Sequence, residues 1–292
     1  MSSPQGVPAP RDRAPDPLAH DWLSICRRVV RAQRTLFDDA SGIAARTEYE
    51  GVGEGGDWAL ALDRSCEQAV FDELDDLAAI GASFTAISEE RGEVGFGEAG
   101  AAVRVVIDPI DGSMNARRTI PSHCLSLAVA SGASMADVEF GYVYDFGAGE
   151  EFAAVRGGGA TLDGEPIVAF EGAAVLEVVG LEAAKPELTV PVVRELEGKV
   201  YRLRVLGSIA ISLCYVANGR FDGMLSLRQA RSVDAAAGQL IAREAGAEVA
   251  FGPQGFDGAD LGLEQRYPVA AARDRERLDL LLEAQSASPG EG

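Results

Sequence analysis

Residues 105–115 read Val-Val-Ile-Asp-Pro-Ile-Asp-Gly-Ser-Met-Asn, and the prediction of the fold starts from them. The apolar, β-branched beginning is typical of a buried strand that ends at Asp108. Pro109 lacks an N–H and disfavours helix at the residue before it, so we expect the chain to turn there. Gly112 lets the backbone come close to a ligand, and Ser113 is a favourable N-cap, so a short helix should follow.

Two carboxylates, Asp108 and Asp111, stand three residues apart at the end of this strand. Carboxylate oxygens bind hard cations, and the free N–H groups at a helix start bind phosphate. The stretch therefore predicts a site for metal ions and a phosphate together. An isolated Asp-x-x-Asp-Gly would indicate a surface turn, whereas its place after a buried strand favours the site.

The overall composition narrows the class of protein. The chain has 292 residues, 47% of them hydrophobic, enough for one large or two modest domains with a sizeable core. No apolar run approaches a membrane span, and the Pro- and Arg-rich beginning lacks the apolar segment of a secretory signal. The four cysteines form no Cys-x-x-Cys pair, which favours reduced thiols. We therefore expect a cytoplasmic protein without a membrane partner.

Charge and histidine content exclude further classes. The formal net charge is −20, so nucleic acid and anionic membranes are poor partners. An acidic protein that handles phosphate must neutralise its site locally, and bound cations do this. Two histidines argue against a histidine-based metal or triad site. Arginine carries nearly all the positive charge, which fits a GC-rich genome or a saline cytoplasm; the sequence does not choose between them.

The run Asp-Pro-Ile-Asp-Gly-Ser at residues 108–113 resembles the signature of the inositol monophosphatase and fructose bisphosphatase superfamily. Two further stretches, around Glu89 and at residues 232–238, match that family in the same order, and the resemblance spans most of the chain between Trp22 and Leu282. Members are magnesium-dependent, lithium-sensitive phosphomonoesterases. The resemblance implies a layered α-β-α-β-α sugar-phosphatase fold of the α/β class, a small phosphorylated substrate and a homodimer.

Acidic residues upstream of Asp108 have counterparts in the family. Glu89 follows an expected strand at residues 83–88 and matches a Glu that bridges metal and water; alone, it would be interpreted as part of a solvated surface pair. Asp63 begins a long helix expected at residues 63–80 and matches an Asp that helps to orient the attacking water. Asp63 could also serve as the N-cap of that helix. A loop is expected at Gly92–Gly100.

The third motif places Asp234 at the start of an Ala-rich helix, where the family has a ligand to its second metal. The resemblance implies two or three Mg²⁺ ions, with Mn²⁺ as an alternative. One ion would be held by Glu89, Asp108 and the carbonyl of Ile110, and another by Asp108, Asp111 and Asp234. Glu89 and Ser113, with Asp63 behind the hydroxyl, would orient the water, and the N–H groups of Gly112 and Ser113 would bind phosphate oxygens.

Substrate selection is expected in the second half of the chain. Gly207, Ser208 and Ile209 match a strand-to-helix turn that meets the substrate hydroxyls in the family, and they also suit an ordinary capped helix start. Inositol-selective members have a Glu where Leu227 stands. Nearby arginines could bind a second phosphate through paired hydrogen bonds, as in the archaeal-type enzymes with dual specificity, or could simply be solvated. These are Arg228 and Arg231.

Apolar periodicity supplies the remaining elements. Helices are expected at residues 18–40, 63–80, 190–196, 210–218 and 234–244, and strands at residues 83–88, 105–108, 124–130, 137–144, 151–155, 174–180, 201–206 and 220–227. We predict a disordered tail at residues 1–17, an α+β half at 18–170 that carries most metal ligands, an α/β half at 171–284 and a second tail at 285–292.

The predicted activity is Mg²⁺-dependent hydrolysis of inositol-1-phosphate, fructose-1,6-bisphosphate or both, by attack of a metal-activated water. Two alternatives stay open. One is another substrate of the family, either 3′-phosphoadenosine 5′-phosphate or histidinol phosphate. The other is a non-catalytic metal-binding protein with the same fold, although every expected ligand type is present.

Overall fold

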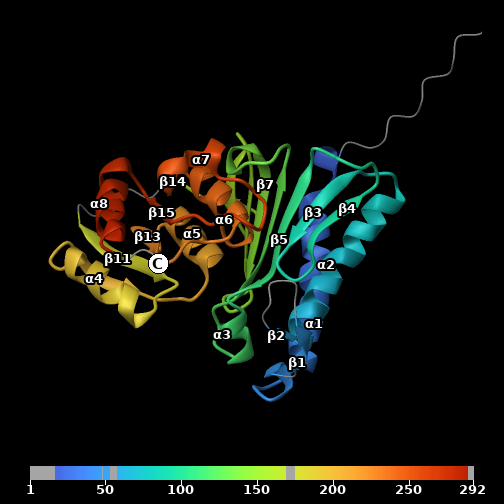
Figure 1. Cartoon of the computed structure of the whole chain (residues 1–292), viewed down its shortest axis with the longest axis horizontal. Coiled ribbons are helices and arrows are strands. Elements are labelled where there is room, and N and C mark those ends of the chain that lie inside the picture. Colours follow the sequence, from blue (N-terminus) through green and yellow to red (C-terminus); the bar gives the residue numbers. More distant parts are fainter. Residues whose placement is uncertain (1–16, 48, 53–57, 169–174, 289–292) are drawn as a thin grey trace, which may run out of the picture.

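The computed structural model describes residues 17–47, 49–52, 58–168 and 175–288. The described residues form two large β-sheets and one two-stranded sheet, and the two large sheets alternate with three layers of helices, in the order α-β-α-β-α (Figure 1). The layered α/β fold predicted from the sequence is thus confirmed. Of the tail expected at residues 1–17, residues 1–16 lie outside the described residues, as does the link expected near residues 171–172, whereas Pro17 begins a short 3-10 helix.

The first sheet has eight strands and carries the Asp108 motif. β3 and β5 are parallel, and the other neighbouring strands are antiparallel. Along β5, Val105 and Ile107 pack under the outer helices while Val106 packs under the central ones, as the two-residue period of a strand requires. In spatial order the strands are β10 (Glu165–Pro166), β9 (Gly159–Leu162), β8 (Glu150–Val155), β7 (Val138–Asp145), β6 (Cys124–Ala130), β5 (Arg104–Asp111), β3 (Phe84–Ser88) and β4 (Gly92–Phe96).

Two long helices cover the outer face of this sheet. α1 (Trp22–Asp39) begins after Asp21, whose carboxylate accepts a hydrogen bond from the N–H of Ser24 at 3.0 Å. This is the N-cap arrangement that satisfies a free donor at a helix start. α2 (Ala61–Ala79) lies beside α1, and both helices bury apolar side chains against the sheet. Both helices were predicted from apolar spacing.

The central layer consists of α5 (Ile209–Ala217) and α6 (Ser232–Glu244), which lie between the two sheets (Figure 1). One continuous apolar core joins these helices to both sheets. A Cβ on Gly141 of β7 would stand 2.7 Å from the carbonyl oxygen of Ala237, closer than real contacts allow. Small residues on both sides therefore let the backbone of α6 approach the sheet.

The second sheet has five strands and lies in the second half of the chain. β11 is parallel to both of its neighbours, β12 and β13, so the carboxyl ends of all three strands meet at one edge. α4 (Pro186–Leu196) and α8 (Arg275–Ser286) cover the outer face. In spatial order the strands are β12 (Val200–Arg204), β11 (Leu176–Glu182), β13 (Gly223–Ser226), β15 (Val269–Ala272) and β14 (Glu248–Phe251).

Two local predictions were wrong. Within the loop expected at Gly92–Gly100, residues 92–96 form the edge strand β4. The ring of Phe96 in this strand stacks on the ring of Phe84, with 4.8 Å between the ring centroids. Glycines in this segment concealed a strand that tertiary pairing stabilises. The chain also does not turn at Asp108, because β5 continues to Asp111 through a break in its register with β6.

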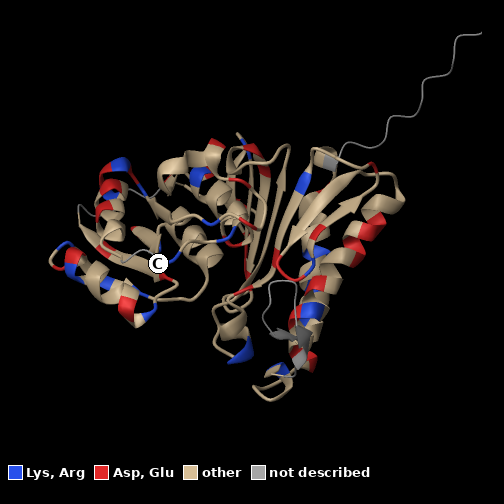
Figure 2. Ribbon diagram, viewed as in Figure 1, with Lys and Arg blue, Asp and Glu red and all other residues tan. Residues whose placement is uncertain are grey.

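The remaining elements are short and connect the layers. No helix in the described ranges is long and apolar enough to cross a membrane. Acidic residues predominate along the outer helix α2, whereas α8 carries both acidic and basic residues (Figure 2). The short elements are η1 (Pro17–Ala19), η2 (Ala45–Thr47), β1 (Tyr49–Val52), β2 (Trp58–Leu60), α3 (Ser113–Arg117), η3 (Met135–Asp137), η4 (Gly252–Gln254) and α7 (Gly255–Gly258).

Candidate active site

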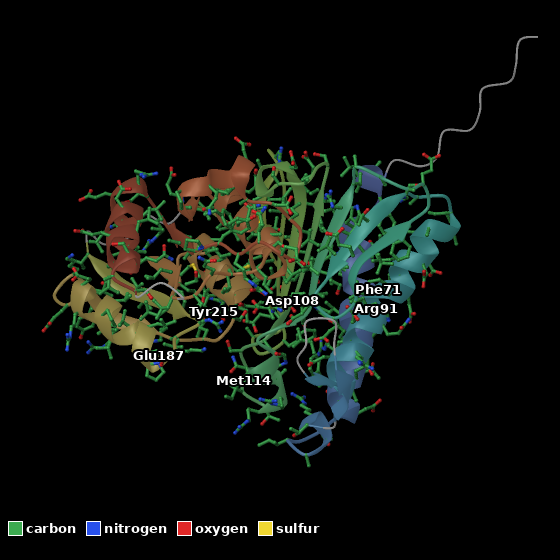
Figure 3. All side chains as sticks on the ribbon, in the orientation of Figure 1. Phe71, Arg91, Asp108, Met114, Glu187 and Tyr215 are labelled. Atoms are coloured by element: carbon green, nitrogen blue, oxygen red, sulfur yellow. The ribbon has the colours of Figure 1, made fainter. Side chains whose placement is uncertain are left out.

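The Asp108 motif lies at the middle of the molecule, between the outer helix α2, marked by Phe71, and the central helix α5, marked by Tyr215 (Figure 3). Asp108 is 2% exposed and accepts a hydrogen bond from the N–H of Ile110 at 3.0 Å. Between Asp108, opposite Ser126, and Asp111, opposite Cys124, β5 has one residue more than β6, so the regular pairing is interrupted at the motif.

Gly112 closes the motif with a left-handed backbone, φ +88°, and is the N-cap of α3. Ser113, which the sequence suggested as the cap, is instead the first helical residue, and its side chain is exposed. A Cβ on Gly112 would stand 2.8 Å from the carbonyl oxygen of Ser122 and 3.2 Å from that of Gly207. Glycine is therefore required here both by the backbone angle and by the space.

The predicted water-orienting residues meet the Asp108 motif at one small cavity. Glu89 comes from the turn after β3 and Asp63 from the first turn of α2. Asp63 is the third residue of that helix, so it is not the N-cap. The cavity has a volume of about 20 Å³, close to the space of one water molecule. It is lined by Asp63, Glu89, Glu90, Asp108, Pro109, Ile110 and Ser113.

Arg231 joins two of the predicted metal ligands. Its guanidinium forms an ion pair with Glu89, and its second terminal nitrogen lies 3.2 Å from Oδ1 of Asp234. The backbone N–H of Arg231 also donates to Oδ2 of Asp234 at 3.0 Å, so Asp234 caps the start of α6. The sequence left open whether Arg231 binds a second phosphate or is solvated; in this structure its guanidinium contacts the carboxylates of Glu89 and Asp234.

Like charges gather around Asp108 and Asp111. Burial, together with the charges of Glu89, Asp111 and Asp234, raises the pKa of Asp108 well above its ordinary value. Burial and Asp234 raise the pKa of Asp111 to about 8, although hydrogen bonds to that carboxylate act in the opposite direction. Burial alone would lower the pKa of Arg231, but the surrounding carboxylates outweigh it and raise this pKa. The site therefore brings several acidic side chains close together around Arg231.

A divalent cation suits this donor set. In the described part of the chain, no three acidic, cysteine or histidine side chains converge closely enough, as they stand, to chelate an ion. Arg231 instead takes the place of a cation between Glu89 and Asp234. Hard oxygen donors and crowded negative charge are what Mg²⁺ requires. The residues that would hold it are Glu89, Asp108, Asp111, Asp234 and the carbonyl of Ile110.

The predicted substrate turn lies directly against the motif. The hydroxyl of Ser208 donates to Oδ2 of Asp111 at 2.7 Å, and the N–H of Ala210 donates to the same oxygen at 2.8 Å. Ser208 also caps α5 by accepting the N–H of Ile211 at 3.2 Å. Gly207 is exposed beside them, and Ile209 is buried at the start of the helix. The structure thus brings residues 207–209 to the Gly112 turn.

Of the other substrate candidates, Arg228 is exposed just after β13, and Leu227 is buried under the outer helices. Two polar residues near the site were missed. Glu182, at the end of β11, binds the 206–207 turn, and Asn115 donates to the carbonyl of Leu206 at 2.6 Å. A carboxylate directly after an apolar strand run was a usable signal for Glu182, since Asp108 was found by the same pattern.

Comparison with known proteins adds independent information. Residues 23–289 match the model of the inositol monophosphatase family. A fructose-1,6-bisphosphatase/inositol-1-monophosphatase of Archaeoglobus fulgidus is 32% identical over 271 residues, covering 89% of this chain and 97% of that protein. The Nus factor SuhB of Escherichia coli is 30% identical over 233 residues, 78% of this chain and 84% of that protein.

A solved structure supports the same relationship. The crystal structure of an inositol monophosphatase–fructose 1,6-bisphosphatase superposes with a TM-score of 0.75 at 25% identity, covering 91% of this chain and all of that one.

Proposed function

This chain belongs to the inositol monophosphatase family, whose relatives include phosphoric monoester hydrolases, and from that membership we propose that it hydrolyses inositol-1-phosphate, fructose-1,6-bisphosphate or both. The observation that carries the proposal is the buried carboxylate cluster around Asp108, beside the Gly112 turn. Such a cluster is unfavourable by itself and becomes favourable when cations and a phosphate bind.

The chemistry needs positioning and charge neutralisation more than covalent catalysis. When bound, Mg²⁺ ions supply a Lewis acid for the phosphate and ease deprotonation of the attacking water. The cavity between Asp63, Glu89 and Asp108 has room for one water molecule. Glu89 accepts the proton from that water, and the Ser113 hydroxyl, with Asp63 behind it, orients the water towards a phosphate held at Gly112. As the water oxygen bonds to phosphorus, the ester P–O bond breaks, and the departing alkoxide takes a proton from solvent to leave as the alcohol.

The leaving alcohol would lie at the start of α5. The phosphate at Gly112 faces residues 207–209, because no side chain separates Gly112 from the carbonyl of Gly207. Asp111 then has two functions: Oδ2 fixes Ser208 and Ala210, while Oδ1 accepts no hydrogen bond from a described residue and is available to a cation. One carboxylate thus links the metal site to the substrate subsite.

The substrate preference remains part of the proposal. Leu227 stands where inositol-selective relatives have Glu, and Arg228 and Arg231 lie nearby, which favours a dual preference that includes the bisphosphate. Arg231 would have to leave Glu89 and Asp234 to bind a second phosphate. Binding of Mg²⁺ to those carboxylates would release it.

The deciding measurement is phosphate release from inositol-1-phosphate, fructose-1,6-bisphosphate, histidinol phosphate and 3′-phosphoadenosine 5′-phosphate, with and without Mg²⁺. We expect Mg²⁺-dependent release from the first two. A strong preference for the nucleotide or histidinol phosphate would replace the substrate assignment. No release from any of them would favour a non-catalytic metal-binding protein.

The arginines are tested on the same substrates. Arg228→Ala and Arg231→Ala should weaken transition-state binding of the bisphosphate by about 1.5–3 kcal/mol, the value of a charge-assisted hydrogen bond, and affect inositol-1-phosphate much less. Arg220→Ala is a suitable control, because Arg220 pairs with Glu150, outside the residues assigned to the site. Equal losses on both substrates would contradict a role in binding the second phosphate.

We propose further, by family resemblance alone, a lithium-sensitive cytoplasmic homodimer that uses two or three Mg²⁺ ions and has neither a nucleic-acid nor a membrane partner. Light scattering at working concentration tests the dimer, and inhibition by LiCl against a NaCl control tests the lithium sensitivity.

A further inference from the structure

The turn at residues 206–208, just before α5, contacts the turn at Gly112, where the phosphate is proposed to bind, through backbone atoms. A Cβ on Gly112 would lie 3.2 Å from the carbonyl oxygen of Gly207, and a Cβ on Gly207 would lie 2.9 Å from Nδ2 of Asn115. The same Nδ2 donates to the carbonyl oxygens of Leu206 at 2.6 Å and Ser122 at 2.7 Å. A displacement of the 206–208 turn therefore changes the space beside a phosphate at Gly112.

A buried carboxylate holds this turn from the opposite side. Glu182 ends β11 and has no exposed surface. Its Oε2 accepts the N–H of Gly207 at 2.8 Å, and its Oε1 accepts the N–H of Leu206 at 3.3 Å and the hydroxyl of Ser212 at 2.6 Å. The Glu182 side chain thus fixes two consecutive N–H groups of the 206–208 turn, and through Ser212 it also fixes the first turn of α5.

Glu182 forms no ion pair with a described residue. A buried carboxylate without a cationic partner is expensive to desolvate, and its hydrogen bonds repay only part of that free energy. Burial raises the pKa of Glu182 to about 7, against the bonds from Ser212, Gly207 and Leu206. The carboxylate offers acceptors to all three donors at once, whereas an amide or an apolar residue would leave at least one of them unpaired. The carboxylate is therefore best explained by the geometry it imposes.

We propose that Glu182 is a positioning residue that holds the Leu206–Ser208 turn against Gly112 and so shapes a subsite for the hydroxyl groups of a polyol phosphate. Asp111 holds the same turn from the first half of the chain, and Glu182 holds it from the second. The subsite is thus fixed by both halves of the molecule. The inference rests on the proposed hydrolysis of sugar or inositol phosphates.

The test compares a polyol phosphate with a phosphate that lacks hydroxyl groups. Glu182→Gln keeps the side-chain volume but removes the charge and one acceptor. For inositol-1-phosphate, we expect KM to rise about tenfold, as for loss of a charge-assisted hydrogen bond, and kcat to change little. For p-nitrophenyl phosphate, which uses only the phosphate site, both constants should stay within about twofold of the wild-type values. Ser212→Ala removes one donor to Glu182. It should also raise KM for inositol-1-phosphate but not for p-nitrophenyl phosphate, by a smaller factor than Glu182→Gln.

A matched control separates positioning from stability. Glu151→Gln alters another buried carboxylate, which accepts hydrogen bonds from Arg27 and Tyr142 in the first half of the chain. This variant should lower the melting temperature and leave KM unchanged for both substrates. Equal changes for both substrates in Glu182→Gln, or no change, would overturn the inference. If Glu182→Gln does not fold, an unchanged KM in Ser212→Ala would overturn it. If the wild type hydrolyses no polyol phosphate, the proposed function fails, which is a separate outcome.

Discussion

Buried carboxylates on the two faces of the first sheet differ in how their charge is balanced. Under α1, Glu151 accepts hydrogen bonds from Arg27 at 2.7 and 2.9 Å and from the Tyr142 hydroxyl at 3.0 Å. On the other face of the sheet, Asp108 and Asp111 lie among further carboxylates, and Arg231 pairs with two of these, Glu89 and Asp234. Glu151 is paired within the chain, whereas several carboxylates crowd around Asp108 and raise its pKa.

This difference shows how a stable fold can contain an unfavourable site. The Glu151 network is complete, so it contributes to folding and needs no ligand. The Asp108 cluster is incomplete, so part of its electrostatic energy becomes available for binding cations and phosphate. Excess buried charge, rather than buried charge itself, distinguishes the functional region from the structural one.

The strongest test removes one charge from each region. Asp108→Asn should lower kcat on the order of a thousandfold, since several kcal/mol of charge stabilisation depend on this shared ligand. Glu151→Gln should keep kcat but reduce the free energy of unfolding by about 1–3 kcal/mol, because it weakens the bonds to Arg27 and Tyr142. Phosphate release and urea unfolding measure the two effects. Loss of activity in both variants would remove the distinction between the regions.

The pH dependence of the free energy of unfolding extends the comparison to Glu182. Unlike Glu151, this buried carboxylate forms no ion pair with a described residue. Burial raises its pKa from the ordinary 4.5 to about 7. Its favourable contribution is therefore fully present below pH 4.5 and is lost as the pH rises through about 7. Relative to Glu182→Gln, the wild type should lose on the order of 3 kcal/mol of unfolding free energy over this range, because one pKa unit corresponds to about 1.4 kcal/mol. Urea unfolding of both proteins at several pH values measures this difference. A constant difference between them would contradict the expectation.

The smallest expected effect is the change in the free energy of unfolding when Mg²⁺ is added back to metal-free protein. In chelator-treated protein, Mg²⁺ at a hundred times its dissociation constant should stabilise the fold by about 2.7 kcal/mol, because only the native state assembles the site. Asp108→Asn should show much less stabilisation, while Glu151→Gln should respond like the wild type. Thermal unfolding, with NaCl at equal ionic strength as the control, measures this. An equal Mg²⁺ response in Asp108→Asn would show that the ion binds elsewhere.

Much of the fold followed from local patterns. Strands such as Cys124–Ala130 were predicted because continuous apolar runs have few alternatives to a buried strand. The helices α1 and α2 followed from apolar spacing in the same way. β4 was missed, because glycines hide its strand preference until pairing with β3 decides it. The cap of α3 shifted by one residue, since Gly112 takes a backbone angle that the sequence alone does not specify.

The sequence by itself determined the family and the layered fold and named acidic candidates such as Asp108, because a long motif and apolar periodicity are local properties of the chain. The tertiary structure decided which of those residues meet. Arg231 and Glu89 are 142 residues apart, and their ion pair depends on how β3 and α6 pack. Glu182 gained its role in the same way, because the turn that it holds becomes its neighbour only when β11 and α5 are assembled. The interaction energy of two charges depends on their distance in space and not on their separation along the chain. The sequence therefore identifies the charged candidates, and the folded structure determines which of them pair.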